Sequence, residues 1–85
     1  MKIWKTTYAD TEIAVVNSLV TTKLQVNGKT QDVYWGLFAF GVRLYGSLKS
    51  NGDTRRIKAV MGAKLLTWDC AIFVDDEAVF SSTDT

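Results

Sequence analysis

The sequence predicts a small all-β domain, an antiparallel β-sandwich or partly open barrel built from consecutive hairpins. Turn residues recur at short spacing, around positions 9–12, 27–28, 50–53 and 75–77, and two of these turns contain Asn-Gly. Asn-Gly between β-rich flanks favours a two-residue hairpin, because both turn residues need positive φ. The chain has no proline, a residue that interrupts strand pairing.

Length and composition set further limits. A chain of 85 residues forms one domain, residues 1–85. Its net charge of +1 gives no overall field that would draw it to nucleic acid or membrane. It has no apolar run near the ~18–20 residues that span a bilayer, and no apolar stretch of a signal peptide follows Met1. We therefore expect a cytoplasmic protein with no membrane partner.

The first four strands follow from two turns. Residues 2–8 and 12–20 are predicted to pair around Asp10-Thr11, with a bulge suggested by Asn17-Ser18. An unbroken register around Asn27-Gly28 places Trp35 on the apolar face with Leu24, and Lys23 opposite Asp32. Trp35 is therefore expected in the core.

The second Asn-Gly turn predicts a hairpin of residues 42–49 and 54–61. Its register gives one apolar face, formed by Val42, Leu44, Gly46 and Leu48 opposite Met61, Ala59, Ile57 and Arg55. A helix near residues 54–68, giving an α+β fold, is the alternative, because Ile57, Val60, Met61, Leu65 and Trp68 also have helical spacing. Gly62 inside that helix would cost about 1 kcal/mol relative to alanine, which favours the strand.

The last hairpin is predicted from residues 67–74 and 78–82. Its register stays open, because residues 71–74 are apolar on both faces, as in a central strand.

The ordered segments LQVNGKTQD, GLF, RLYGSLKSNG, IKAVMG and DCAIFVDDEAVF resemble small uncharacterised bacterial proteins in which a succession of hairpins ends in a C-x-I-F-V-D strand and turn. The likeness covers about residues 17–80. The paired Asn-Gly turn and the late hairpin are also similar to the β-sandwich half of Fas apoptotic inhibitory molecule. These resemblances imply a bacterial protein with a compact β-sandwich, and they carry over no catalytic residue.

The residues that usually perform chemistry are scarce. Histidine is absent and Cys70 is the single cysteine, so a metal site is not expected, and no cofactor motif is present. Alternation places Cys70 in or near the core as a small apolar residue. Asp75-Asp76-Glu77 is predicted to be a solvated turn. We expect no enzymatic activity and no cofactor.

Two surfaces are candidates for binding. The apolar connection 36–41 contains Leu37, Phe38 and Phe40, which either cap the core or form a protein interface, most simply in a homodimer. The polar face of the 42–61 hairpin carries Arg43, Tyr45, Arg56 and Lys58, which either solvate the sheet or bind nucleic acid. The sequence thus predicts a domain that acts by protein binding or self-assembly, with nucleic-acid binding as the alternative.

Overall fold

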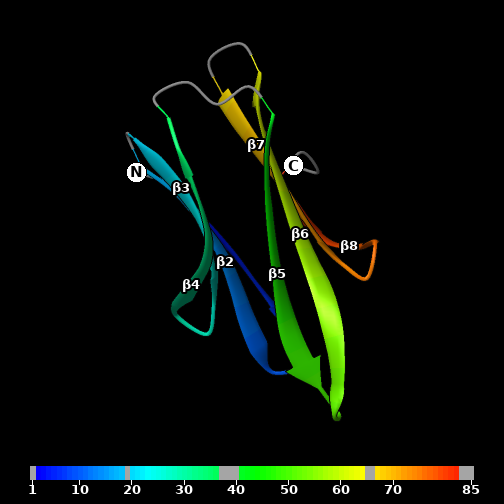
Figure 1. The fold of residues 1–85 in the computed structure, drawn as a ribbon. Helices are drawn as coiled ribbons and strands as arrows, with labels where there is room; N and C mark the ends of the chain where they lie inside the picture. Colours follow the sequence, from blue (N-terminus) through cyan, green and yellow to red (C-terminus); the bar gives the residue numbers. More distant parts are fainter. Residues whose placement is uncertain (1, 19, 37–40, 65–66, 83–85) are drawn as a thin grey trace.

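The computed structural model describes residues 2–18, 20–36, 41–64 and 67–82, and the side chains of 63–68 are not described. These residues form two four-stranded antiparallel sheets, ordered β1-β2-β3-β4 and β5-β6-β7-β8 (Figure 1). The strands are β1 Lys2–Tyr8, β2 Thr11–Asn17, β3 Thr21–Val26, β4 Lys29–Trp35, β5 Val42–Ser50, β6 Asp53–Lys64, β7 Thr67–Val74 and β8 Glu77–Ser81. The predicted all-β class is confirmed.

Four tight turns close hairpins inside the sheets. Both residues of each turn have positive φ, between 47° and 83°, as two-residue type I′ connections require. Asparagine, aspartate and glycine tolerate this conformation better than other residues do. The turns are Ala9-Asp10, Asn27-Gly28, Asn51-Gly52 and Asp75-Asp76.

The alternative of a helix near residues 54–68 is wrong. β6 runs without interruption from Asp53 to Lys64, because the Asn51-Gly52 turn returns the chain directly along β5. The predicted register of this hairpin is confirmed, from Val42 opposite Met61 to Leu48 opposite Arg55. One face of the hairpin is therefore largely buried in the core, and the other carries Arg43, Lys49, Arg56 and Lys58.

The predicted register of the first Asn-Gly hairpin is wrong beyond its first two pairs. A β-bulge places Thr30 opposite Gln25 and Asp32 opposite Leu24, so Gln31 is an extra residue in β4. A shift of one residue reverses the side chains that follow. Lys23 consequently lies opposite Val33, and Trp35 is 72% exposed instead of buried.

The first turn consists of Ala9-Asp10 and not of the predicted Asp10-Thr11, because Tyr8 pairs directly with Thr11. β2 ends at Asn17, and the bulge predicted at Asn17-Ser18 is wrong, because β2 pairs with β1 and β3 without a shift in register. The last hairpin closes at Asp75-Asp76. Its register shifts between Ile72 and Phe73, because the opposite strand β8 has one extra residue there.

The core lies between the two sheets and draws on both. Strand alternation sends every second side chain inward, and the innermost are almost fully shielded from solvent. The largest of these are Ile13, Leu24, Leu44, Ile57, Met61 and Ile72. No helix in the described residues is long and apolar enough to cross a membrane.

The second sheet repeats the construction of the first. Ile13 opposite Val26 in β2 and β3 corresponds to Ile57 opposite Val74 in β6 and β7. In β8 as in β4, two regular pairs follow the turn and one extra residue then forms a bulge; in β8 this residue is Val79. Each half of the chain is therefore one copy of the same four-stranded unit.

Hydrogen bonds at the turns repeat as well. The amide of Asn27 donates to the carbonyl of Glu12 at 2.8 Å, and Oδ1 of Asn27 accepts from the Glu12 amide at 2.9 Å. Asp75 makes the same two bonds with Arg56, both at 2.9 Å. An Asx side chain at this position fastens each turn to the neighbouring strand.

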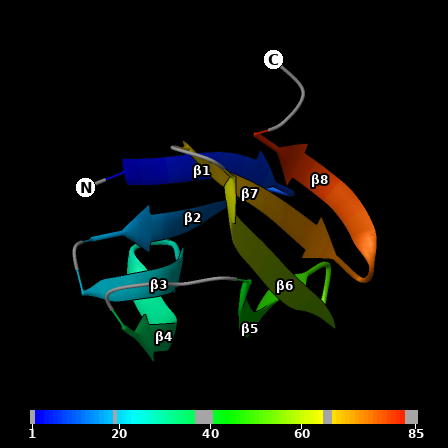
Figure 2. The same ribbon diagram turned by 90° about the horizontal axis from the view of Figure 1, so that it is seen from above.

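The edges of the two sheets approach each other in two places, which we call seams: β4 beside β5, and β8 beside β1. Seen from above, β4 and β5 lie at one side of the sandwich, and β1 and β8 lie at the other (Figure 2). Neither seam is a continuous strand pairing, so the fold is a sandwich with four edge strands.

Candidate functional site

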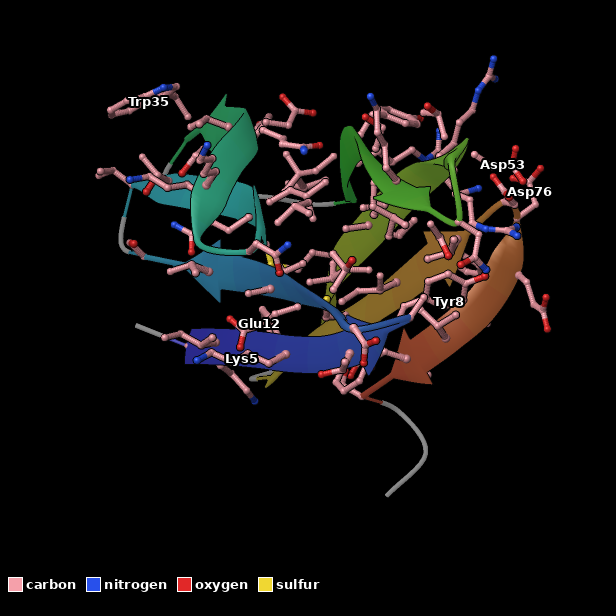
Figure 3. All side chains as sticks on the ribbon, turned by 90° about the horizontal axis from the view of Figure 1, so that it is seen from below. Lys5, Tyr8, Glu12, Trp35, Asp53 and Asp76 are labelled. Atoms are coloured by element: carbon pink, nitrogen blue, oxygen red, sulfur yellow. The ribbon has the colours of Figure 1, made fainter. Side chains whose placement is uncertain are left out.

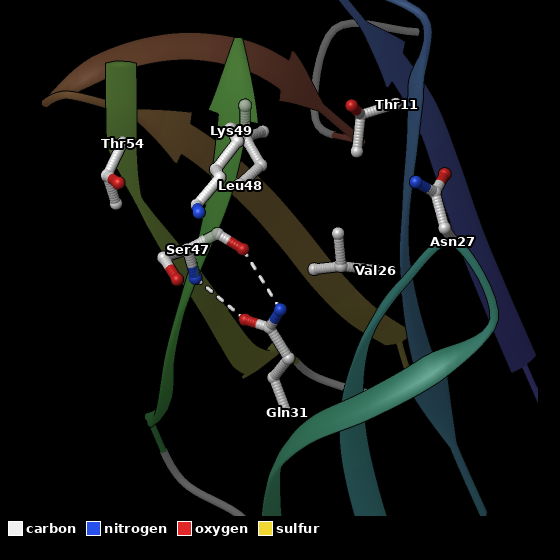
Figure 4. A pocket seen from close by; sticks show the side chains of 8 residues that line it. All are labelled: Thr11, Val26, Asn27, Gln31, Ser47, Leu48, Lys49 and Thr54. Atoms are coloured by element: carbon white, nitrogen blue, oxygen red, sulfur yellow. Dashed lines mark hydrogen bonds between the residues drawn. The ribbon is translucent and has the colours of Figure 1, made fainter. Parts of the chain in front are cut away.

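Side chains of the β4 bulge seal the seam between β4 and β5. Gln31 accepts a hydrogen bond from the Ser47 amide at 2.7 Å and donates one to the Ser47 carbonyl at 2.9 Å, as a neighbouring strand would (Figure 4). Asp32 accepts from the Tyr45 amide at 2.8 Å and from the Val33 amide at 2.9 Å. These bonds occupy backbone groups at which another strand would pair.

Glycine is required where Gln31 crosses β5. A Cβ on Gly46 would collide with Oε1 of Gln31 and would lie 3.0 Å from Cδ2 of Leu24. The missing side chain gives Gln31 room to reach Ser47.

The equivalent seam between β8 and β1 lacks this polar closure. In the internal repeat, β1 corresponds to β5, so Lys5 and Thr7 occupy the positions of Tyr45 and Ser47. Val79 and Phe80 of β8 occupy those of Gln31 and Asp32. Because neither of these side chains has a hydrogen-bond acceptor, they cannot bind the amides of β1 as Gln31 and Asp32 bind those of β5.

Apolar contact holds the β8/β1 seam instead. Tyr8, Val79 and Phe80 are partly buried and pack against the core. Figure 3 shows Tyr8 at the end of β1, directed toward β8, while Lys5 extends outward from the sheet. Among the described residues, β1 pairs with β2 on one side and with no strand on the other, so its second backbone edge, which includes Lys5 and Thr7, is unpaired by any described strand.

A small pocket unites three of the four residues predicted for nucleic-acid binding. Tyr45, Arg56 and Lys58 line it together with Asp75 and Asp76, and its volume is about 270 Å³. Tyr45 lies directly opposite Lys58 and is 56% exposed. Arg43 lies on the same face, two residues before Tyr45, but outside the pocket.

The charges around this pocket are partly fixed. Arg55 forms an ion pair with Asp75 at 3.0 Å. A hydrogen bond from the backbone amide of Arg56 lowers the pKa of the Asp75 carboxyl group. The hydrogen bond from the Arg55 side chain and the positive charges of Arg55 and Arg56 lower this pKa further. The Lys58 ammonium lies 5.0 Å from the centroid of the Phe73 ring. The predicted solvated turn at 75–77 is thus also a structural anchor.

A second pocket lies beside the β4/β5 seam, close to the Asn27-Gly28 turn. Its volume is about 480 Å³, and Figure 4 shows the Gln31–Ser47 bonds at its margin. The lining combines apolar, amide and hydroxyl groups with a single charged residue, and comprises Thr11, Val26, Asn27, Gln31, Ser47, Leu48, Lys49 and Thr54.

The predicted interface residues Leu37, Phe38 and Phe40 lie outside the described residues, so their role stays a prediction. The chain that leads to them exposes aromatic side chains. Trp35 points away from β4 in Figure 3, and Tyr34 is 40% exposed. Sequence reasoning missed the exposure of Trp35, although Gln31 on the predicted apolar face was a signal that the register changes.

Cys70 is buried, as predicted, with 1% of its surface exposed. Burial raises the pKa of its thiol to about 12, so the thiolate that a nucleophile requires is disfavoured at neutral pH. Within the described ranges, no group of three or more His, Cys, Asp or Glu is placed to hold a metal ion.

Comparisons of the chain with protein-family models, curated proteins and solved structures found no match. The resemblance to small bacterial proteins therefore stays a prediction.

Proposed function

We propose that this chain is a self-assembling domain that forms a homodimer through its β8/β1 seam. One observation carries the proposal: of two equivalent seams, one is closed by hydrogen bonds from Gln31 and Asp32, and the other has Val79 and Phe80 at those positions. An unblocked edge strand is a template for pairing with another chain.

Charge favours β8 of a second copy as the strand that pairs with β1. β1 carries Lys2 and Lys5 and no acidic residue, while Glu77 begins β8 directly after Asp76 and β8 has no basic residue. Pairing of two β1 strands would instead bring lysines together. Lysine on an edge strand usually opposes pairing, but an acidic partner strand removes that opposition.

Symmetry favours a closed assembly. Each copy presents both a β1 edge and a β8 edge on the same side (Figure 2). A two-fold axis can therefore match β1 with β8 of the partner and β8 with β1 of the partner at once. Such an interface uses both edges and forms a dimer rather than a fibre.

Sedimentation velocity across a concentration series tests the assembly. The wild-type chain is expected at twice 9.5 kDa. Lys5→Glu, which places an acidic residue beside the acidic β8 of the partner, is expected to shift the equilibrium to monomer. Lys23→Glu is the matched control, because Lys23 lies on a central strand of the same sheet. Circular dichroism verifies that each variant is folded. A wild-type monomer at millimolar concentration would refute the proposal.

Amide hydrogen exchange locates the interface within the same molecule. The Tyr45 and Ser47 amides should exchange slowly at every concentration, because side chains of the same chain bind them. The Lys5 and Thr7 amides should become protected only where the chain is dimeric. If the dimer forms and these two amides stay unprotected, or if Trp35→Ser abolishes the dimer and Lys5→Glu does not, association occurs elsewhere.

A further inference from the structure

The pocket on the outer face of the second sheet has features of a ligand site that are independent of self-assembly. We infer that it binds one base of single-stranded nucleic acid, with the neighbouring phosphates on Arg56 and Lys58. Tyr45, Arg56 and Lys58 come from two paired strands, and the register fixes all three side chains on one face.

Two positive charges are available at the pocket. The Asp75 carboxylate forms its ion pair with Arg55 and accepts a hydrogen bond from the backbone amide of Arg56. None of these described contacts involves the guanidinium group of Arg56. Lys58 lies opposite Tyr45 in the strand register, and its ammonium is 5.0 Å from the centroid of the Phe73 ring on β7. Phosphate contacts of this kind supply most of the sequence-independent affinity for nucleic acid.

An exposed ring beside the cations makes a single strand the fitting ligand. Tyr45 is 56% exposed in the middle of β5, where an unpaired base can stack on it. The pocket volume of about 270 Å³ is at the small end for ligand sites and leaves room for one base. In a duplex the bases are already stacked on one another and cannot reach the ring.

Charge along β5 extends the track beyond the pocket. Arg43 and Lys49 lie on the same outer face as Tyr45, on either side of it. Asp75 and Asp76, which also line the pocket, oppose the phosphates and limit the affinity. The arrangement predicts binding that is moderate in strength and sensitive to salt.

Fluorescence anisotropy with a labelled twelve-nucleotide deoxythymidine strand tests the site. With two to four phosphate contacts, the logarithm of Kd should rise with the logarithm of salt concentration with a slope of about 1.4 to 2.8. Tyr45→Ala should weaken binding by roughly 5- to 150-fold, the range for loss of one stacked base. Arg56→Ala should lower the slope by about 0.7, and Asp76→Asn should tighten binding.

Matched substitutions on the other sheet separate the site from general charge. Tyr34→Ala and Lys29→Ala, which change an exposed tyrosine and an exposed lysine of β4, should leave binding within twofold of wild type. A labelled duplex of equal length should bind more weakly than the single strand. Absence of binding at 20 mM salt, equal affinity for the duplex, or equal losses from Tyr45→Ala and Tyr34→Ala would each overturn the inference. Folding of every variant is verified by circular dichroism.

Discussion

Replacing Gln31 by alanine removes both hydrogen bonds that join the bulge of β4 to Ser47 of β5. Each bond contributes about 0.5–1.5 kcal/mol to the free energy of unfolding. Because Gln31 and Ser47 are both exposed, water replaces part of this interaction, and we expect a total loss of about 1–2 kcal/mol. For a domain of this size, that lowers Tm by roughly 4–16 °C.

Urea unfolding followed by far-ultraviolet circular dichroism measures this loss. Gln25→Ala is the control, because the side-chain amide of Gln25 makes one long hydrogen bond among the described residues, to Oγ1 of Thr30 at 3.4 Å on the exposed face. We expect this control to change stability by less than about 0.5 kcal/mol. If Gln31→Ala costs no more than Gln25→Ala, the side-chain seam does not stabilise the fold and our account of it is wrong.

A double-mutant cycle with Gly46 tests the crossing of Gln31 over β5. Gly46→Ala alone forces its new methyl group against Oε1 of Gln31 and should destabilise the domain. In the Gln31→Ala background the same methyl group meets only the flexible end of Leu24, so its cost should fall by at least about 0.5 kcal/mol. Strict additivity of the two substitutions would show that they do not contact one another.

Three further predictions follow from the turns, the buried thiol and the anchoring carboxylate. Gly28→Ala should cost about 1 kcal/mol in urea unfolding, because Gly28 has φ of 81°, whereas Gly62→Ala should be neutral because its Cβ meets no atom within 4 Å. The Cys70 thiol should react with Ellman's reagent only after unfolding, so rapid labelling of the native protein would contradict its burial. The pKa of the Asp75 carboxyl group is lower in the folded chain than in the unfolded chain. Its contribution to the free energy of unfolding is therefore fully present above the unfolded pKa of about 3.9, and is lost as pH falls through the pKa of the folded chain. Asp75→Asn should therefore reduce the loss of stability below pH 4, measured by thermal melts, and an unchanged pH profile would refute this role.

Local patterns in the chain predicted the register of the second Asn-Gly hairpin, with a helix near residues 54–68 as the alternative. Asn51-Gly52 leaves little choice of turn, and Leu44 and Ile57 fall on the same face only in the observed register. The burial of Cys70 followed from the same alternation. These features depend on residues close together in sequence, so local rules describe them well.

The same rules failed at the first Asn-Gly hairpin. Nothing in the strand pattern required an extra residue at Gln31, and an unbroken register buried Trp35. The bulge carries Gln31 and Asp32 to Ser47 and Tyr45 of β5, which lie on the other sheet and more than ten residues away along the chain. A prediction from one hairpin could not include those partners.

Sequence reasoning was sufficient for the all-β class, the two Asn-Gly turns, the register of one hairpin and the common face of Tyr45, Arg56 and Lys58. The way the two sheets meet, and the difference between the two seams, emerged only from the folded structure. So did the exposure of Trp35 within the first sheet and the ion pair of Arg55 with Asp75 within the second. The physical reason is that turn conformation and side-chain alternation are properties of neighbouring residues, while a seam depends on hydrogen-bonding groups that come together only when both sheets have formed.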